Sequence, residues 1–106
     1  MESTSLHRAF SAKPDRQLRA NPAVLSTSGA TGATAILDSE KGQFYSLNDV
    51  GGRVWSLLCE GTTFRAIVDQ LQREYDVSAE TVSVDVERLL EQFARIGLLR
   101  TEGGGA

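Results

Sequence analysis

The chain has 106 residues, with 11 Lys and Arg, 14 Asp and Glu, and a net charge of −3 at pH 7. This length suits one compact domain, and the acidic balance disfavours a protein that tracks nucleic-acid phosphates. The single cysteine excludes an intramolecular disulfide, the start MESTSLHRAF lacks the apolar run of a signal peptide, and no stretch approaches the roughly 20 apolar residues of a membrane span. The sequence therefore predicts a cytoplasmic protein that binds neither membranes nor nucleic acid.

The first third of the chain changes from an irregular segment to strand-like patterns. Residues 1–20 show no periodicity, so we interpret them as a flexible arm, followed by a domain over 21–100 and a flexible tail over 101–106. Residues 23–28 and 34–38 are predicted strands. Residues 43–47 are a third, and Gly42 can take the positive φ of a tight hairpin. The second and third strands are therefore predicted to pair.

Amphipathic helices follow the strands. Asn48 or Asp49 supplies a capping oxygen for a first helix, and residues 60–63 end it and cap a second, in which apolar residues recur at helical spacing. Ser78 is the predicted cap of a third helix, which runs to about residue 96, and residues 98–100 can add a short strand. The predicted fold is α+β and resembles a winged helix-turn-helix: a three-stranded antiparallel sheet followed by three helices.

The residues that could carry chemistry do not form a catalytic pattern. His7 is the only histidine and lies in the predicted arm. Cys59 has no nearby Cys or His, so we predict a small buried hydrophobic side chain. "GATGA" (29–33) lacks the Lys and Ser/Thr of a phosphate loop and precedes a strand, so we predict a hairpin turn. We therefore expect no enzyme activity, no cofactor and no metal site.

A winged helix-turn-helix order also suggests a DNA-binding regulator, whose final helix would read a groove. That helix carries four acidic residues and two arginines. They are Glu80, Asp85, Glu87 and Glu91, against Arg88 and Arg95. This balance repels phosphate, so DNA binding stays a disfavoured alternative.

A series of short motifs runs in order through residues 22–100. They are "ILD" (36–38), "YSLNDVGGRVW" (45–55), "GTT" (61–63), "IVDQL" (67–71), "DV" (85–86) and "GLL" (97–99). In order and spacing these motifs resemble the PqqD-like family, the RiPP recognition elements that bind leader peptides of ribosomally made natural products.

This resemblance implies that a leader peptide adds a strand beside the third strand and lays side chains against the third helix. The implied peptide-binding residues come from both elements. They are Phe44, Tyr45, Ser46 and Leu47 on the strand, and Val82, Asp85, Val86, Leu89 and Phe93 on the helix. An edge strand offers unpaired backbone groups for such a peptide. The apolar members have an alternative role in packing, because a small domain needs its apolar residues for the core.

The implied function is a non-catalytic adaptor that delivers the precursor to a processing enzyme: a leader peptidase, a cyclase or a radical enzyme. Family members serve lasso-peptide or quinone-cofactor pathways, and the aromatic third strand here is closer to the lasso-type elements. A structural subunit that docks on an enzyme rather than on a peptide is a further alternative.

Overall fold

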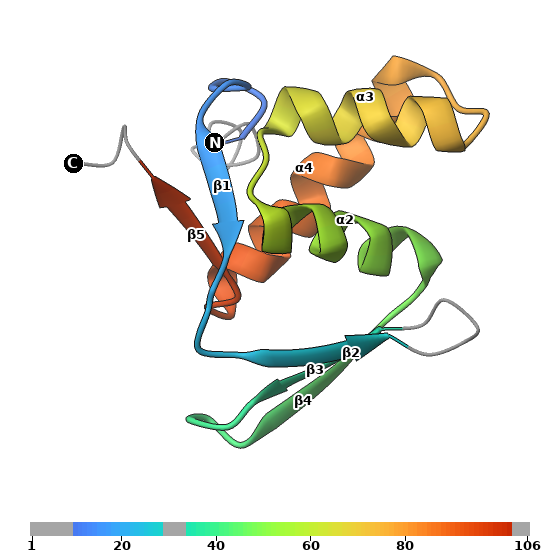
Figure 1. Ribbon diagram of the computed structural model, residues 1–106. Coiled ribbons are helices and arrows are strands. Elements are labelled where there is room, and N and C mark those ends of the chain that lie inside the picture. Colours follow the sequence, from blue (N-terminus) through green and yellow to red (C-terminus); the bar gives the residue numbers. More distant parts are fainter. Residues whose placement is uncertain (1–9, 29–33, 103–106) are drawn as a thin grey trace, which may run out of the picture.

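The computed structural model describes residues 10–28 and 34–102 and arranges them as two antiparallel sheets and three helices (Figure 1). The elements in chain order are β1 (Gln17–Ala20), β2 (Leu25–Ser28), β3 (Thr34–Asp38), β4 (Gln43–Leu47), α2 (Asp49–Glu60), α3 (Phe64–Glu74), α4 (Ala79–Arg95) and β5 (Leu99–Glu102). The three-stranded sheet has the order β2-β3-β4, and the helices follow it in the sequence. The predicted α+β fold is confirmed.

The β3–β4 hairpin forms as the sequence predicts. Asp38 pairs with Gln43 at its closed end, and Gly42 in the turn has a φ of +67°, which side chains with a Cβ rarely adopt. Ile36 in the central strand is fully buried, whereas its neighbour Leu37 is exposed. One face of this sheet therefore packs on the helices, and the other is open to solvent (Figure 1).

Each helix begins at a side-chain cap. Asn48 accepts a hydrogen bond from the Gly51 N–H at 2.8 Å, which decides between the two predicted caps. Thr63 and Ser78 cap α3 and α4 in the same way. A Cβ on Gly51 would lie 3.2 Å from the Asn48 Oδ1 atom. This close approach explains why one of the two adjacent positions is a glycine.

The predicted flexible arm is wrong for residues 10–20, which are folded. β1 pairs with β5 in antiparallel register, with Leu18 opposite Thr101, and Leu18 is only 1% exposed. Phe10 is also buried in the core. The four residues of β1 contain only two apolar side chains, and their partner strand lies about 80 residues away. No local pattern therefore marks this strand, and the domain extends beyond 21–100 at both ends.

The segment 10–16, here called the N-terminal strap, is held by backbone hydrogen bonds to the helices. The buried carboxylate of Glu87 in α4 accepts hydrogen bonds from the N–H groups of Phe10, at 3.0 Å, and Ser11, at 2.7 Å. The Arg65 N–H of α3 donates to the Pro14 carbonyl at 3.0 Å. Glu87 therefore has a structural role, although its charge alone predicts only a place on the solvent face of α4.

The structure corrects two further predictions, namely where the C-terminal tail starts and whether Cys59 is buried. The predicted tail starts too early, because Thr101 lies in β5; residues 103–106, like 1–9 and the predicted turn at 29–33, lie outside the described residues. Cys59 is exposed rather than buried. It follows Leu58 in α2 and lies off the face that Val54 and Leu58 bury in the core. Partial desolvation nevertheless raises the pKa of its thiol, which keeps it protonated and weakly nucleophilic at neutral pH.

Candidate functional site

The outer edge of β4 is the feature that positions the candidate site. In the order β2-β3-β4, only one side of β4 pairs with a neighbouring strand. Because the backbone groups of a strand point alternately to its two sides, half of the N–H and C=O groups of β4 face away from β3. Such an edge can accept a further strand by backbone hydrogen bonding alone.

The side chains of β4 alternate between the two faces of the sheet. Tyr45 and Leu47 are half-buried and pack against the core, on the helix side. Phe44 and Ser46 are exposed, and Phe44 retains 67% of its accessible surface. A strand added to this edge would therefore meet two apolar side chains on the inner face and a large exposed ring on the outer face.

The predicted residues of α4 fall into two groups. Asp85 is exposed and Leu89 is half-buried, so both are available to a ligand. Val82, Val86 and Phe93 are at most 6% exposed and belong to the core. The Phe93 ring contacts Trp55 of α2 edge-on. In the structure as it stands, these three residues support the helix rather than present an open surface.

The β3–β4 turn is tied to the end of α4 by a contact that sequence reasoning missed. The Lys41 ammonium donates a hydrogen bond to the Ile96 carbonyl at 3.0 Å, and the Lys41 N–H donates to the buried Asp38 carboxylate at 3.3 Å. A lysine near a helix C-terminus is favoured by the helix dipole. This link joins the β3–β4 turn to the end of α4, but a lysine in a polar turn gives no sequence signal for so distant a partner.

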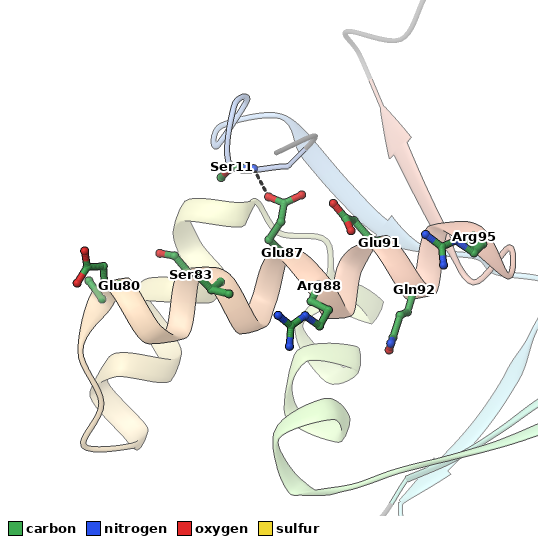
Figure 2. Close-up of a pocket in the computed structure, with 10 residues that line it drawn as sticks. Ser11, Glu80, Ser83, Glu87, Arg88, Glu91, Gln92 and Arg95 are labelled. Atoms are coloured by element: carbon green, nitrogen blue, oxygen red, sulfur yellow. Dashed lines mark hydrogen bonds between the residues drawn. The ribbon is translucent and has the colours of Figure 1, made fainter. Parts of the chain in front are cut away.

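Two cavities lie away from the predicted binding residues. The larger, of about 860 Å³, runs along α4 beside Ser11 of the strap, and charged side chains border it (Figure 2). The other, of about 660 Å³, lies between Pro14, the start of α3 and Ser83. None of the nine predicted binding residues lines either cavity. The wall of the larger one includes Glu87, whose carboxylate already holds the strap.

The paired charges of the described residues are structural. Arg53 in α2 donates three hydrogen bonds of 2.8–2.9 Å to the Glu74 carboxylate in α3, and the bonds from Arg53 and then Gln70 hold the pKa of Glu74 below its ordinary value. Arg65 pairs with Asp15 of the strap at 2.9 Å. The described part of the chain contains no cluster of three His, Cys, Asp or Glu side chains that could hold a metal ion. No helix within residues 10–28 and 34–102 has the length and apolar character needed to span a bilayer.

Comparisons with known proteins identify one matching family and two similar solved structures. The model of the family described as coenzyme PQQ synthesis protein D (PqqD) matches residues 33–99. The solved structure of TbiB1 in complex with the TbiA(beta) leader peptide is similar to this chain, with 33% identity and a TM-score of 0.74, and the match covers 80% of this chain and 98% of TbiB1.

A lasso peptide synthetase B1 complexed with its leader peptide has the same fold, with 22% identity, a TM-score of 0.69 and coverage of 78% of this chain and 96% of that protein. The curated proteins give no significant match. The family match spans more than half of this chain, and TbiB1 matches it over nearly its own whole length. Because the family model matches more than half of its residues, the chain belongs to the PqqD family.

Proposed function

We propose that this protein binds the leader segment of a ribosomally synthesised precursor peptide and delivers it to a processing enzyme in natural-product biosynthesis. The observation that carries the proposal is the open edge of β4 in a chain that is 33% identical to TbiB1, a protein solved with a leader peptide bound. The leader adds as a strand beside β4 and turns alternate side chains toward α4.

The backbone supplies the affinity in this proposal. Each hydrogen bond between the leader and the β4 edge contributes about 1 kcal/mol net, so a few of them hold a peptide without demanding a particular sequence. The hydrogen bond from Lys41 to Ile96 supports this arrangement, because it connects the β3–β4 turn to the end of α4 before the peptide arrives.

The side chains supply selectivity. Tyr45 and Leu47 contact the inward side chains of the leader from β4, and Leu89 contacts the same leader side chains from α4. Exposed Asp85 favours a basic leader residue opposite it. Phe44 and Ser46 flank the leader on the outer face. Val82, Val86 and Phe93 complete the proposed site from beneath, as packing residues that hold Asp85 and Leu89 in position.

The protein is an adaptor without catalysis of its own, and the chemistry belongs to its partner: a leader peptidase, a cyclase or a radical enzyme. The aromatic strand β4 favours a lasso-peptide pathway over a quinone-cofactor pathway. We place the step in the cytoplasm, where the precursor is made, and the exposed, unpaired Cys59 fits a reducing compartment.

Isothermal titration of the full chain with the synthetic leader of a precursor encoded beside its gene tests the proposal. We expect saturable binding and amide NMR shifts over residues 43–47, and a scrambled leader should produce neither. No heat and no shift in β4 would overturn the proposal.

A DNA probe serves as the contrast for the winged-helix alternative. Exposed Glu80 and Asp85 offset Arg88 and Arg95 on α4, so we expect no salt-dependent retention of the probe. Retention of the DNA probe without leader binding would favour a DNA-binding regulator over a peptide-binding adaptor.

A further inference from the structure

The N-terminal strap holds α4 by a buried charged group. Glu87, near the middle of α4, is 7% exposed, and its two carboxylate oxygens accept hydrogen bonds from the backbone N–H groups of Phe10 and Ser11. Figure 2 shows the Glu87 side chain turned toward Ser11 of the strap. A nonpolar side chain would fill this position without the cost of dehydrating a carboxylate. Packing alone therefore does not account for a glutamate here.

The strap is also anchored to parts of the domain other than α4. The Arg65 N–H of α3 donates a hydrogen bond to the Pro14 carbonyl, and the Arg65 guanidinium pairs with Asp15. The chain continues from the strap into β1, which pairs with β5. Because α3 and β1 hold the strap, its hydrogen bonds to Glu87 position α4 relative to these elements.

Glu87 and the proposed leader-binding residues of α4 lie on opposite sides of the helix. Asp85 and Leu89 are each two positions from Glu87, and two residues turn a helix by about 200°. Val86 and Leu90, which are buried in the core, lie between these two sides. Apolar core contacts are non-directional, whereas hydrogen bonds require a defined geometry. The core therefore holds α4 on the domain, and the hydrogen bonds to Glu87 fix its rotation about its own axis.

The strap lies outside the part of the chain that the family model matches. The match covers residues 33–99, which contain Glu87 but not residues 10–16. The strap is therefore an addition to the matched region and contacts it through α3 and α4. Such an addition can change how the matched region binds a ligand without contacting that ligand itself.

We infer that the strap sets the affinity for the leader, and that Glu87 is the positioning residue through which it acts. With the strap bound, Asp85 and Leu89 face the leader beside β4; without the hydrogen bonds to Glu87, α4 rotates and this alignment is lost. The inference rests on the proposed function and adds a control of the same site. Because the strap and the leader favour the same position of α4, leader binding also holds the strap more firmly.

Three variants of the full chain separate this effect from a general loss of stability. Glu87→Gln keeps the length of the side chain but removes its charge, which weakens the hydrogen bonds from the strap. Phe10→Ala removes the buried ring at the start of the strap. Asp15→Asn is the matched control, because Asp15 also belongs to the strap but its ion pair is with Arg65 of α3.

Isothermal titration with the synthetic leader of a precursor encoded beside the gene measures the affinity. Thermal melts establish that each variant is folded at the temperature of the titration. We expect Glu87→Gln and Phe10→Ala each to raise the Kd for the leader at least fivefold, and Asp15→Asn to stay within twofold of the wild type.

Hydrogen exchange of the wild type, followed by NMR, supplies a readout that a purely structural role of Glu87 would not change. Saturating leader should slow exchange of the Phe10 and Ser11 amides at least threefold more than that of the Leu71 amide in α3, which reports the general stability gained on binding. This measurement needs no variant, so it decides the question even if Glu87→Gln does not fold.

Several results would contradict the inference. If the wild type binds the leader and both Glu87→Gln and Phe10→Ala bind equally well, the strap does not set the affinity, and the proposed function stands. An equal loss in Asp15→Asn and Glu87→Gln would exclude a specific role of α4. Equal slowing of all three amides would exclude the coupling between strap and leader. If the wild type does not bind the leader, the inference and the proposed function both fail.

Discussion

The ring of Trp55 in α2 meets the ring of Phe93 in α4 edge-on, with centroids 5.7 Å apart and ring planes at 84°. Both side chains are at least 97% buried, and the pair joins the helix that follows β4 to the helix proposed to face the leader. Aromatic pairs in this geometry contribute about 0.5–1.5 kcal/mol beyond the burial of their area. The pair therefore connects the stability of the domain to the shape of the proposed site.

A double-mutant cycle tests this connection. Trp55→Leu and Phe93→Leu should each lower the free energy of unfolding, and the cycle should give a coupling energy of about 1 kcal/mol. Urea unfolding followed by circular dichroism measures both quantities. A coupling energy near zero would mean that the rings contribute only through their burial.

Replacing Leu18 tests the folded N-terminal region. Leu18 in β1 is 1% exposed, so Leu18→Ala should lower the free energy of unfolding by about 3 kcal/mol through lost burial and the cavity left behind. Thr101→Val, at the exposed position opposite it in β5, should change stability by less than about 0.5 kcal/mol. Equal thermal melts for Leu18→Ala and the wild type would contradict the pairing of β1 with β5.

Glu74 should make the free energy of unfolding depend on pH. The hydrogen bonds from Arg53 and Gln70 lower the pKa of Glu74 from its ordinary value of 4.5 in the folded protein. Its contribution is therefore complete above that value and disappears as the pH falls through the lower, folded pKa. Since both side chains are about one-third exposed, Glu74→Gln should cost less than about 1 kcal/mol at neutral pH.

Urea unfolding of the wild type and Glu74→Gln across this pH range measures the effect. The difference in the free energy of unfolding between the two proteins should shrink below pH 4.5. Glu40→Gln, in the exposed β3–β4 turn, is the control and should run parallel to the wild type. If the difference in the free energy of unfolding stays constant with pH, the Arg53–Glu74 pair does not contribute to the loss of stability in acid.

Proline in β4 tests strand addition directly. Ser46→Pro removes one backbone N–H and fixes φ, so we expect leader affinity to fall at least tenfold. Ser46→Ala keeps the N–H and should bind normally. A thermal melt must accompany the titration, because a lower melting temperature would show that this N–H serves the β3 ladder instead. If Ser46→Pro changes neither binding nor melting, β4 is not the docking edge.

Asp85 is predicted to favour leaders that carry a basic residue opposite it. For a leader with a basic residue opposite it, Asp85→Asn should weaken binding by at most about 1 kcal/mol, roughly fivefold, because the side chain is exposed. High salt should erase the difference. Glu80→Gln, another exposed acid of α4, serves as the control. Equal dissociation constants for several basic leaders would exclude Asp85 from the site.

Local signals in the sequence predicted much of the fold. The hairpin needed Gly42 at a positive φ, and α2, α3 and α4 begin at the side-chain caps Asn48, Thr63 and Ser78. Such features are decided by residues within one turn of each other, so they can be identified from the chain alone. The motif order that resembles the PqqD-like family was likewise visible, and the family match confirms it.

Distant contacts could not be predicted in this way. The pairing of Leu18 with Thr101, the hydrogen bonds from the strap to Glu87 and the tie from Lys41 to Ile96 join residues 55 to 83 positions apart. The exposed apolar side chains of Leu25, Leu37 and Phe44 also lie next to one another only because the register aligns three strands. The sequence by itself determined the elements from β2 to α4 and their order, because these depend on short-range sterics and capping. Only the tertiary structure decided which edges and faces stay open, because that depends on which distant surfaces bury one another.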